Sequence, residues 1–196
     1  SDGSLPDGLT IMESNVFARC KNITAFKINE ENNDFFIVRD GVVFDASGKT
    51  LLAYPAGKTS TSYGIPSGVT KVAGDAFYGN SFLTEVKLPD SVNTLGAYAF
   101  CECPSLNSIN LPSGIKTLND FTFAYTGFTS FIIPDSVVDV SYSVFECCDK
   151  LKTLTIPGTI TTIDASFAWG CDSLETVIIK QGVEEIETDA FAYCQS

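Results

Sequence analysis

Seven cysteines are the residues of this sequence with the most chemistry open to them. Grouped thiols can hold a metal ion, act as nucleophiles or pair as disulfides. Five of the seven follow one position of a repeated motif by three residues, so the repeat, rather than the geometry of a ligand set, determines their spacing. We therefore interpret them as a column of small, buried, reduced side chains and predict no metal site. The five are Cys20, Cys103, Cys148, Cys171 and Cys194.

Other motifs that could support catalysis fail on their details. The chain has no histidine, which removes Ser–His and Cys–His nucleophile pairs and every histidine metal ligand. Gly48-Lys49-Thr50 and Gly57-Lys58-Thr59 resemble the end of a phosphate-binding loop. A true loop needs a glycine five residues earlier, where this chain has Val43 and Leu52. The sequence therefore predicts a protein that is not an enzyme and holds no cofactor.

Charge and hydropathy exclude further partners. The formal net charge is −12 and the pI is about 4.2. An acidic chain is repelled by nucleic acid and by anionic membrane surfaces, so we expect neither as a direct partner. No apolar run is long enough to cross a bilayer, so we expect no membrane insertion.

The whole chain is built on a repeat with an aromatic anchor. Phe100 follows Phe77 by 23 residues, and Phe123 follows Phe100 by 23. Between anchors, Leu-x-x-Ile-x-Leu predicts a short parallel strand ended by proline, and a second apolar pair follows on the opposite side of the coil. Ala-Phe-x-x-Cys predicts a single helical or 3₁₀ turn. Such a unit cannot bury its apolar side alone, so copies must stack. The later anchors are Phe145, Ala168 in the reversed pair Phe167-Ala168, and Phe191.

The sequence also predicts which residues fill this stack and where an insertion interrupts it. We expect the anchor phenylalanines to be buried and stacked on one another, with Phe167 turned inward beside them. Residues Asn29 to Gly64 break the register and predict an insertion within the second repeat. In this insertion, Asp40-Gly41 is a strong hairpin signal between apolar runs, which predicts a small antiparallel meander. The prediction is one solenoid domain over residues 1–196 that carries this insertion.

The unit Leu-x-x-Ile-x-Leu-Pro-x-x-Ile-x-x-Leu-x-x-x-Ala-Phe-x-x-Cys resembles the BspA-like leucine-rich repeat of bacterial cell-surface and secreted proteins. The similarity covers nearly all of residues 5–194. The resemblance implies a leucine-rich-repeat solenoid with a curved parallel β-sheet and no catalysis. It also implies an extracellular or bacterial cell-surface location and a role in adhesion or recognition of host or matrix proteins.

We expect binding through the exposed sheet face, to an extracellular protein or a glycan. The alternative is a structural spacer repeat within a larger cell-surface protein. Consecutive strands of a solenoid align their exposed side chains, which gives a broad surface rather than a pocket. Two isoleucines interrupt the polar residues of one such row, and exposed apolar groups often mark contact sites. The sequence identifies neither the ligand nor the oligomeric state. The predicted binding row is Lys87, Asn110, Ile132, Thr155 and Ile178.

Overall fold

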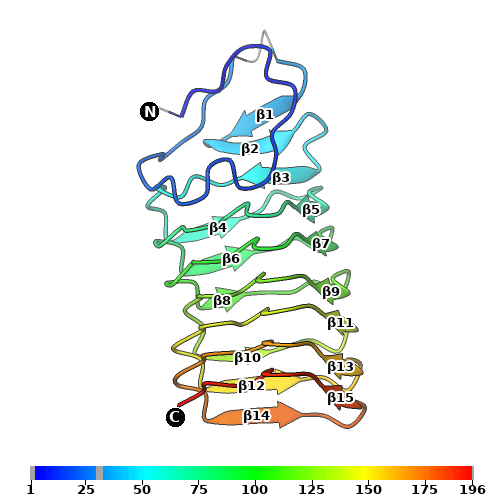
Figure 1. Cartoon of the computed structure of the whole chain (residues 1–196). Helices are drawn as coiled ribbons and strands as arrows, with labels where there is room; N and C mark the ends of the chain where they lie inside the picture. Colours follow the sequence, from blue (N-terminus) through cyan, green and yellow to red (C-terminus); the bar gives the residue numbers. More distant parts are fainter. Residues whose placement is uncertain (1–2, 30–32, 196) are drawn as a thin grey trace.

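The computed structural model describes residues 3–29 and 33–195, and its strands stack as the coils of a solenoid with two strand-bearing faces (Figure 1). The first face is a ladder of parallel strands whose buried residues alternate with exposed ones. Its strands are β4 (Ser62–Gly64), β6 (Glu85–Lys87), β8 (Ser108–Ile109), β10 (Ser130–Ile132), β12 (Thr153–Ile156) and β14 (Thr176–Ile179). The second face carries the second apolar pair of each coil. Its strands are β5 (Lys71–Val72), β7 (Thr94–Leu95), β9 (Thr117–Leu118), β11 (Asp139–Val140), β13 (Thr162–Ile163) and β15 (Glu185–Ile186). The predicted solenoid with parallel sheets is confirmed.

The predicted antiparallel meander is also present. Strands β1 (Phe36–Arg39), β2 (Val42–Asp45) and β3 (Thr50–Ala53) pair in order and antiparallel. The turn between β1 and β2 holds Asp40 and Gly41 at φ 50° and 78°, the left-handed pair that a tight hairpin requires. On its other edge β3 pairs in parallel with β5. Tyr54, directly after β3, stacks on Phe77 at 4.9 Å. The end of the meander therefore continues both the second face and the aromatic column.

The turns around the anchors are not helical, which corrects one prediction. No helix occurs among residues 3–29 and 33–195. The residues two before and two after an anchor have positive φ, as at Tyr98 (60°) and Glu102 (55°) around Phe100. Alternate amides then donate to the next coil, as from Phe100 N to the Thr122 carbonyl oxygen at 3.0 Å. Because these amides bond between coils, they cannot form the consecutive bonds that a helix needs.

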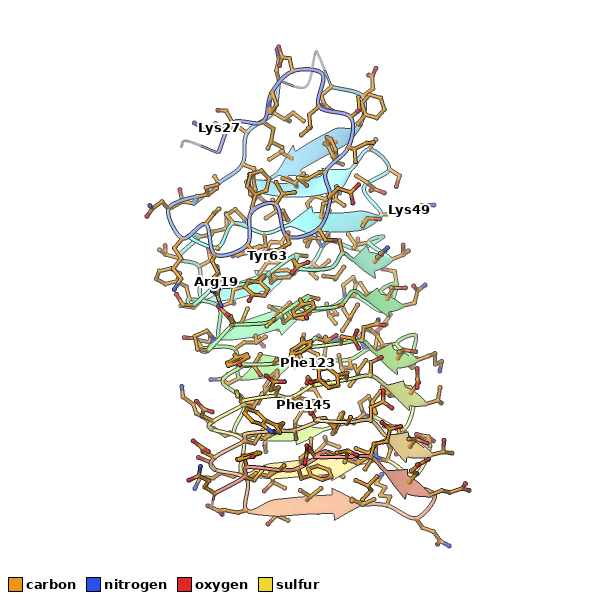
Figure 2. All side chains as sticks on the ribbon, viewed as in Figure 1. Arg19, Lys27, Lys49, Tyr63, Phe123 and Phe145 are labelled. Atoms are coloured by element: carbon orange, nitrogen blue, oxygen red, sulfur yellow. The ribbon has the colours of Figure 1, made fainter. Side chains whose placement is uncertain are left out.

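The core is one continuous column of aromatic rings along the solenoid axis. Phe77, Phe100, Phe123 and Phe145 are fully buried and stack in sequence, with ring centroids 4.8, 5.8 and 5.7 Å apart. Phe167 is fully buried and meets Phe145 edge-on at 5.5 Å, as the reversed pair predicted. Figure 2 shows Phe123 and Phe145 inside the stack. Phe191 was also predicted to be buried but is only half-buried, and it meets Phe167 edge-on at 6.4 Å.

Candidate functional site

Three of the five predicted binding residues lie side by side. Parallel pairing places Ile132 opposite Thr155, and Thr155 opposite Ile178. The two isoleucines are 71% and 48% exposed. Their side chains point away from the core because side chains alternate along a strand and the preceding residues, Phe131 and Val177, pack toward it. The structure therefore forms a short row with an exposed isoleucine at each end.

The other two predicted residues lie on a separate part of the same face. Lys87 is on β6, which pairs with β4 and β8, whereas β10 begins a second sheet with β12 and β14. The break coincides with the coil from Phe123 to Phe145, which is one residue shorter than its predecessors. Asn110, just past β8, donates from Nδ2 to the Leu88 carbonyl and accepts from the Leu88 amide, both at 2.8 Å. Its side chain thus joins two coils and leaves only its outer edge for a ligand.

Two shallow hollows lie on this face, and the first of them spans the break. One of about 270 Å³ has Ile109, Phe131 and Ile132 in its lining, and the other of about 370 Å³ runs over β6 and β8 beside Lys87. Both hollows share Ser108 and Ile109, so they form one groove across the face. Sequence reasoning missed this groove, although the short coil was its signal. The face is therefore hollowed over β6, β8 and β10.

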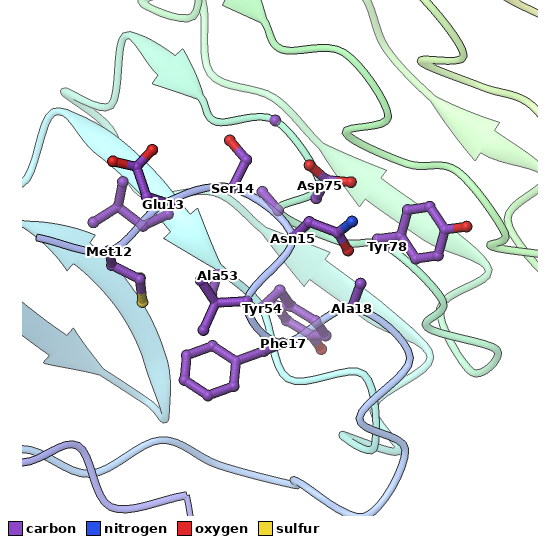
Figure 3. Close-up of a pocket in the computed structure, with 14 residues that line it drawn as sticks. Met12, Glu13, Ser14, Asn15, Phe17, Ala18, Ala53, Tyr54, Asp75 and Tyr78 are labelled. Carbon is purple, nitrogen blue, oxygen red and sulfur yellow. The ribbon is translucent and has the colours of Figure 1, made fainter.

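A pocket at the first coil is too small to hold a ligand. Figure 3 shows the loop around Phe17 packed over Tyr54, Asp75 and Tyr78. The free volume is about 20 Å³, room for about one water molecule. This contact is consequently packing between the first coil and the solenoid.

The cysteine column lies within the core and donates hydrogen bonds. Four of the five thiols reach the anchor carbonyl one coil earlier, as Cys103 does to Phe77 at 3.2 Å and Cys171 to Phe145 at 3.1 Å. Cys20 and Cys194, at the two ends of the column, are only half-buried, contrary to the prediction. Asn80 and Thr126 occupy the same slot in their coils, which sequence reasoning missed although both follow an anchor by three residues. All seven thiols are free. Over residues 3–29 and 33–195, no group of three or more potential ligands is placed to hold a metal.

We expect the buried thiols to resist alkylation in the folded protein. Burial raises the pKa of Cys101 to about 12 and raises that of Cys103 further. Relative to an ordinary thiol pKa of 9.0, this lowers the reactive thiolate fraction at Cys101 about a thousandfold. Iodoacetamide labelling followed by peptide mass spectrometry should modify both residues only after unfolding in urea. Labelling of Cys103 at the same rate with and without urea would contradict its burial.

Comparisons with known proteins identify the repeat. The model of the BspA type leucine-rich repeat region matches residues 1–36 and 60–196 in six copies. No curated protein matches the chain. Among residues 3–29 and 33–195, no helix has the length and hydropathy needed to cross a membrane.

Solved bacterial structures share the architecture. The chain is similar to a leucine-rich cell-surface protein of Faecalibacterium prausnitzii A2-165, with 27% identity, a TM-score of 0.81, and coverage of 90% of this chain and 47% of that one. It is also similar to the pneumococcal vaccine antigen PcpA, with 26% identity, a TM-score of 0.75, and coverage of 93% and 43%. The chain thus spans about half the length of these relatives. The family match and these likenesses agree with the coils described above, and the chain belongs to the BspA-type leucine-rich-repeat family.

Proposed function

We propose that the chain is a non-catalytic binding module of an extracellular or cell-surface protein. It recognises a host or matrix protein, or a glycan, through the exposed face of β10, β12 and β14. The observation that supports this most is the row of Ile132, Thr155 and Ile178, where apolar side chains point to solvent without contributing to the core. Release of water from such groups favours association.

The neighbouring residues favour a partner of mixed polarity. Lys152 and Glu175 pair at 3.2 Å beside the row, and Lys180 pairs with Asp135 at 2.9 Å. These exposed ion pairs contribute little stability of their own and are available to a partner's charges. An apolar centre with a polar rim is the usual composition of a protein-binding surface.

A double substitution tests the proposal. The variant Ile132→Asp with Ile178→Asp should fold normally, because both side chains are exposed. It should weaken binding of any ligand found in a screen of matrix proteins and glycans by about tenfold or more, since two charges would be buried without partners. Binding is measured by surface plasmon resonance, and the fold by circular dichroism.

A matched control makes the same chemical change elsewhere. Ile11 and Val138 are 69% and 52% exposed and lie off the row. Their double change to aspartate adds the same charge and should leave affinity unaltered. If both double variants bind as the parent does, the binding site is elsewhere. If no ligand binds the parent at all, the spacer role is favoured.

A further inference from the structure

We propose that the turn side of the solenoid binds arginine-bearing segments of a basic protein partner, independently of the sheet face. We define the turn face as the segments around the anchors: residues 73–80, 96–103, 119–126, 141–148, 164–171 and 187–194. These segments contain seven carboxylates and no lysine or arginine. The carboxylates are Asp75, Glu102, Asp120, Glu146, Asp164, Glu187 and Asp189.

Aromatic side chains accompany these carboxylates at the surface. Tyr98 stacks on Phe121 at 4.7 Å, and Phe121 meets Tyr142 at 5.4 Å, so these rings form a ladder beside the core column. Tyr125 and Tyr142 are 42% and 44% exposed. Aromatic rings beside carboxylates favour cations, and guanidinium in particular, because its plane can stack on a ring while its N–H groups bond carboxylate oxygens.

The protein already binds one of its own arginines in this way. Arg19, from the first coil, donates from Nε to Glu102 at 2.7 Å and from a terminal nitrogen to the other oxygen of the same carboxylate. Its guanidinium lies over the Tyr78 ring, 5.7 Å from the centroid, and Tyr78 donates its hydroxyl to Glu102 at 2.9 Å. The contact pulls the pKa of Glu102 below its usual value, through the Arg19 hydrogen bonds first. Figure 2 shows Arg19 on the left side of the stack.

A second tyrosine–glutamate pair has the same composition but no arginine. Tyr125 donates its hydroxyl to Glu146, one coil further on, at 3.3 Å. In the first pair the tyrosine follows its anchor by one residue and the glutamate follows its anchor by two. In the second pair these offsets are exchanged. Within residues 3–29 and 33–195, no basic side chain pairs with Glu146 and no ring stacks on Tyr125. The pair is therefore a receptor like the one that Arg19 fills, open to an arginine from another protein.

The surroundings fit an extended basic segment. A hollow of about 170 Å³ has in its lining one member of each pair, Glu102 and Tyr125, together with Lys21. Lys150 donates to the carbonyl oxygen of Pro104, which also lines the hollow, at 3.4 Å. Neither Lys21 nor Lys150 pairs with Glu146 among the ion pairs of residues 3–29 and 33–195. The net charge of −12 adds a long-range attraction for basic partners.

The test uses a fluorescein-labelled dodecapeptide of four Arg-Gly-Ser units, with fluorescence anisotropy at 50 mM salt as the readout. Glu146→Gln should weaken peptide binding about tenfold, because a charge-assisted bidentate contact is lost. Tyr125→Leu should weaken it about threefold. The control Asp90→Asn removes the same charge from an exposed loop residue off the turn face, and should change affinity less than twofold. A peptide with citrulline in place of arginine should not bind.

The Arg19→Ala variant provides an independent test, because it leaves the site formed by Tyr78 and Glu102 open. It should bind about twice as many peptides per chain as the parent, as measured by calorimetry. The Ile132→Asp, Ile178→Asp variant should bind the peptide normally, so failure of the sheet-face proposal would leave this one standing. Equal losses for Glu146→Gln and Asp90→Asn, or unchanged stoichiometry in a folded Arg19→Ala, would overturn the proposal.

Discussion

Replacing Phe100 by alanine is expected to lower the free energy of unfolding by about 3–5 kcal/mol, the range for a fully buried phenylalanine. Phe100 has no exposed surface, and its ring is stacked between Phe77 at 4.8 Å and Phe123 at 5.8 Å. In a solenoid each coil contacts only its neighbours, so this one cavity would weaken two interfaces between coils. Urea unfolding followed by circular dichroism measures the loss.

The matched control is Phe82→Ala, since Phe82 is 39% exposed and lies outside the aromatic column. Its loss should stay below about 1 kcal/mol. If Phe100→Ala also lost less than about 1 kcal/mol, the anchor column would not be the main element that holds the coils in register.

The core could be predicted from the repeat offsets, because each coil places apolar residues at the same distances in sequence from its anchor. Even the reversed pair followed the rule: Phe167 is fully buried although Ala168 holds the anchor position by count. Both residues of the pair are fully buried, and the Phe167 ring enters the column one position early to meet Phe145. Register is thus a collective property of the stack, and a local exception does not shift it.

The turn conformation could not be predicted in the same way. Ala-Phe-x-x-Cys is compatible with a helical turn, and no glycine marks the positions around Phe100 where φ is positive. The left-handed residues are favoured by backbone bonds to the next coil, which exist only once the coils stack. Conformations that depend on partners distant in sequence leave no local signal.

Only part of the predicted row lies on one uninterrupted sheet, for a related reason. Ile132, Thr155 and Ile178 align because their strands pair without interruption. Asn110 lies just past the paired residues of β6 and β8, where its side-chain amide bonds the Leu88 backbone. A polar side chain on this face can point to solvent or bond the adjacent coil. Which of the two occurs depends on how the two coils are offset in space, and the spacing of residues in the sequence does not give that offset.

Replacing Asn80 by alanine is expected to lower the free energy of unfolding by about 4 kcal/mol, although the residue is polar. Asn80 is fully buried in the slot that cysteine fills in other coils. Its Nδ2 lies 3.2–3.3 Å from the carbonyl oxygens of Pro55, Ala56 and Lys58. Its Oδ1 accepts hydrogen bonds from the backbone amides of Phe82 and Leu83, at 3.0 and 2.9 Å. Each buried group left without a partner costs about 1–3 kcal/mol, and the losses here are shared among neighbours.

The Asn80→Cys variant separates hydrogen bonding from packing. A thiol can donate to one carbonyl, as Cys103 does, but accepts poorly from two amides. We therefore expect about half the loss seen with alanine, and loss of hydrogen-exchange protection at Gly57 and Lys58, whose loop Asn80 holds against the solenoid. Asn93→Ala, at an exposed asparagine, is the control and should change stability by less than about 0.5 kcal/mol. Equal stability of the alanine and cysteine variants would show that the Asn80 amide contributes through its volume alone. Unchanged hydrogen-exchange protection at Gly57 and Lys58 in both variants would show that other contacts hold the loop.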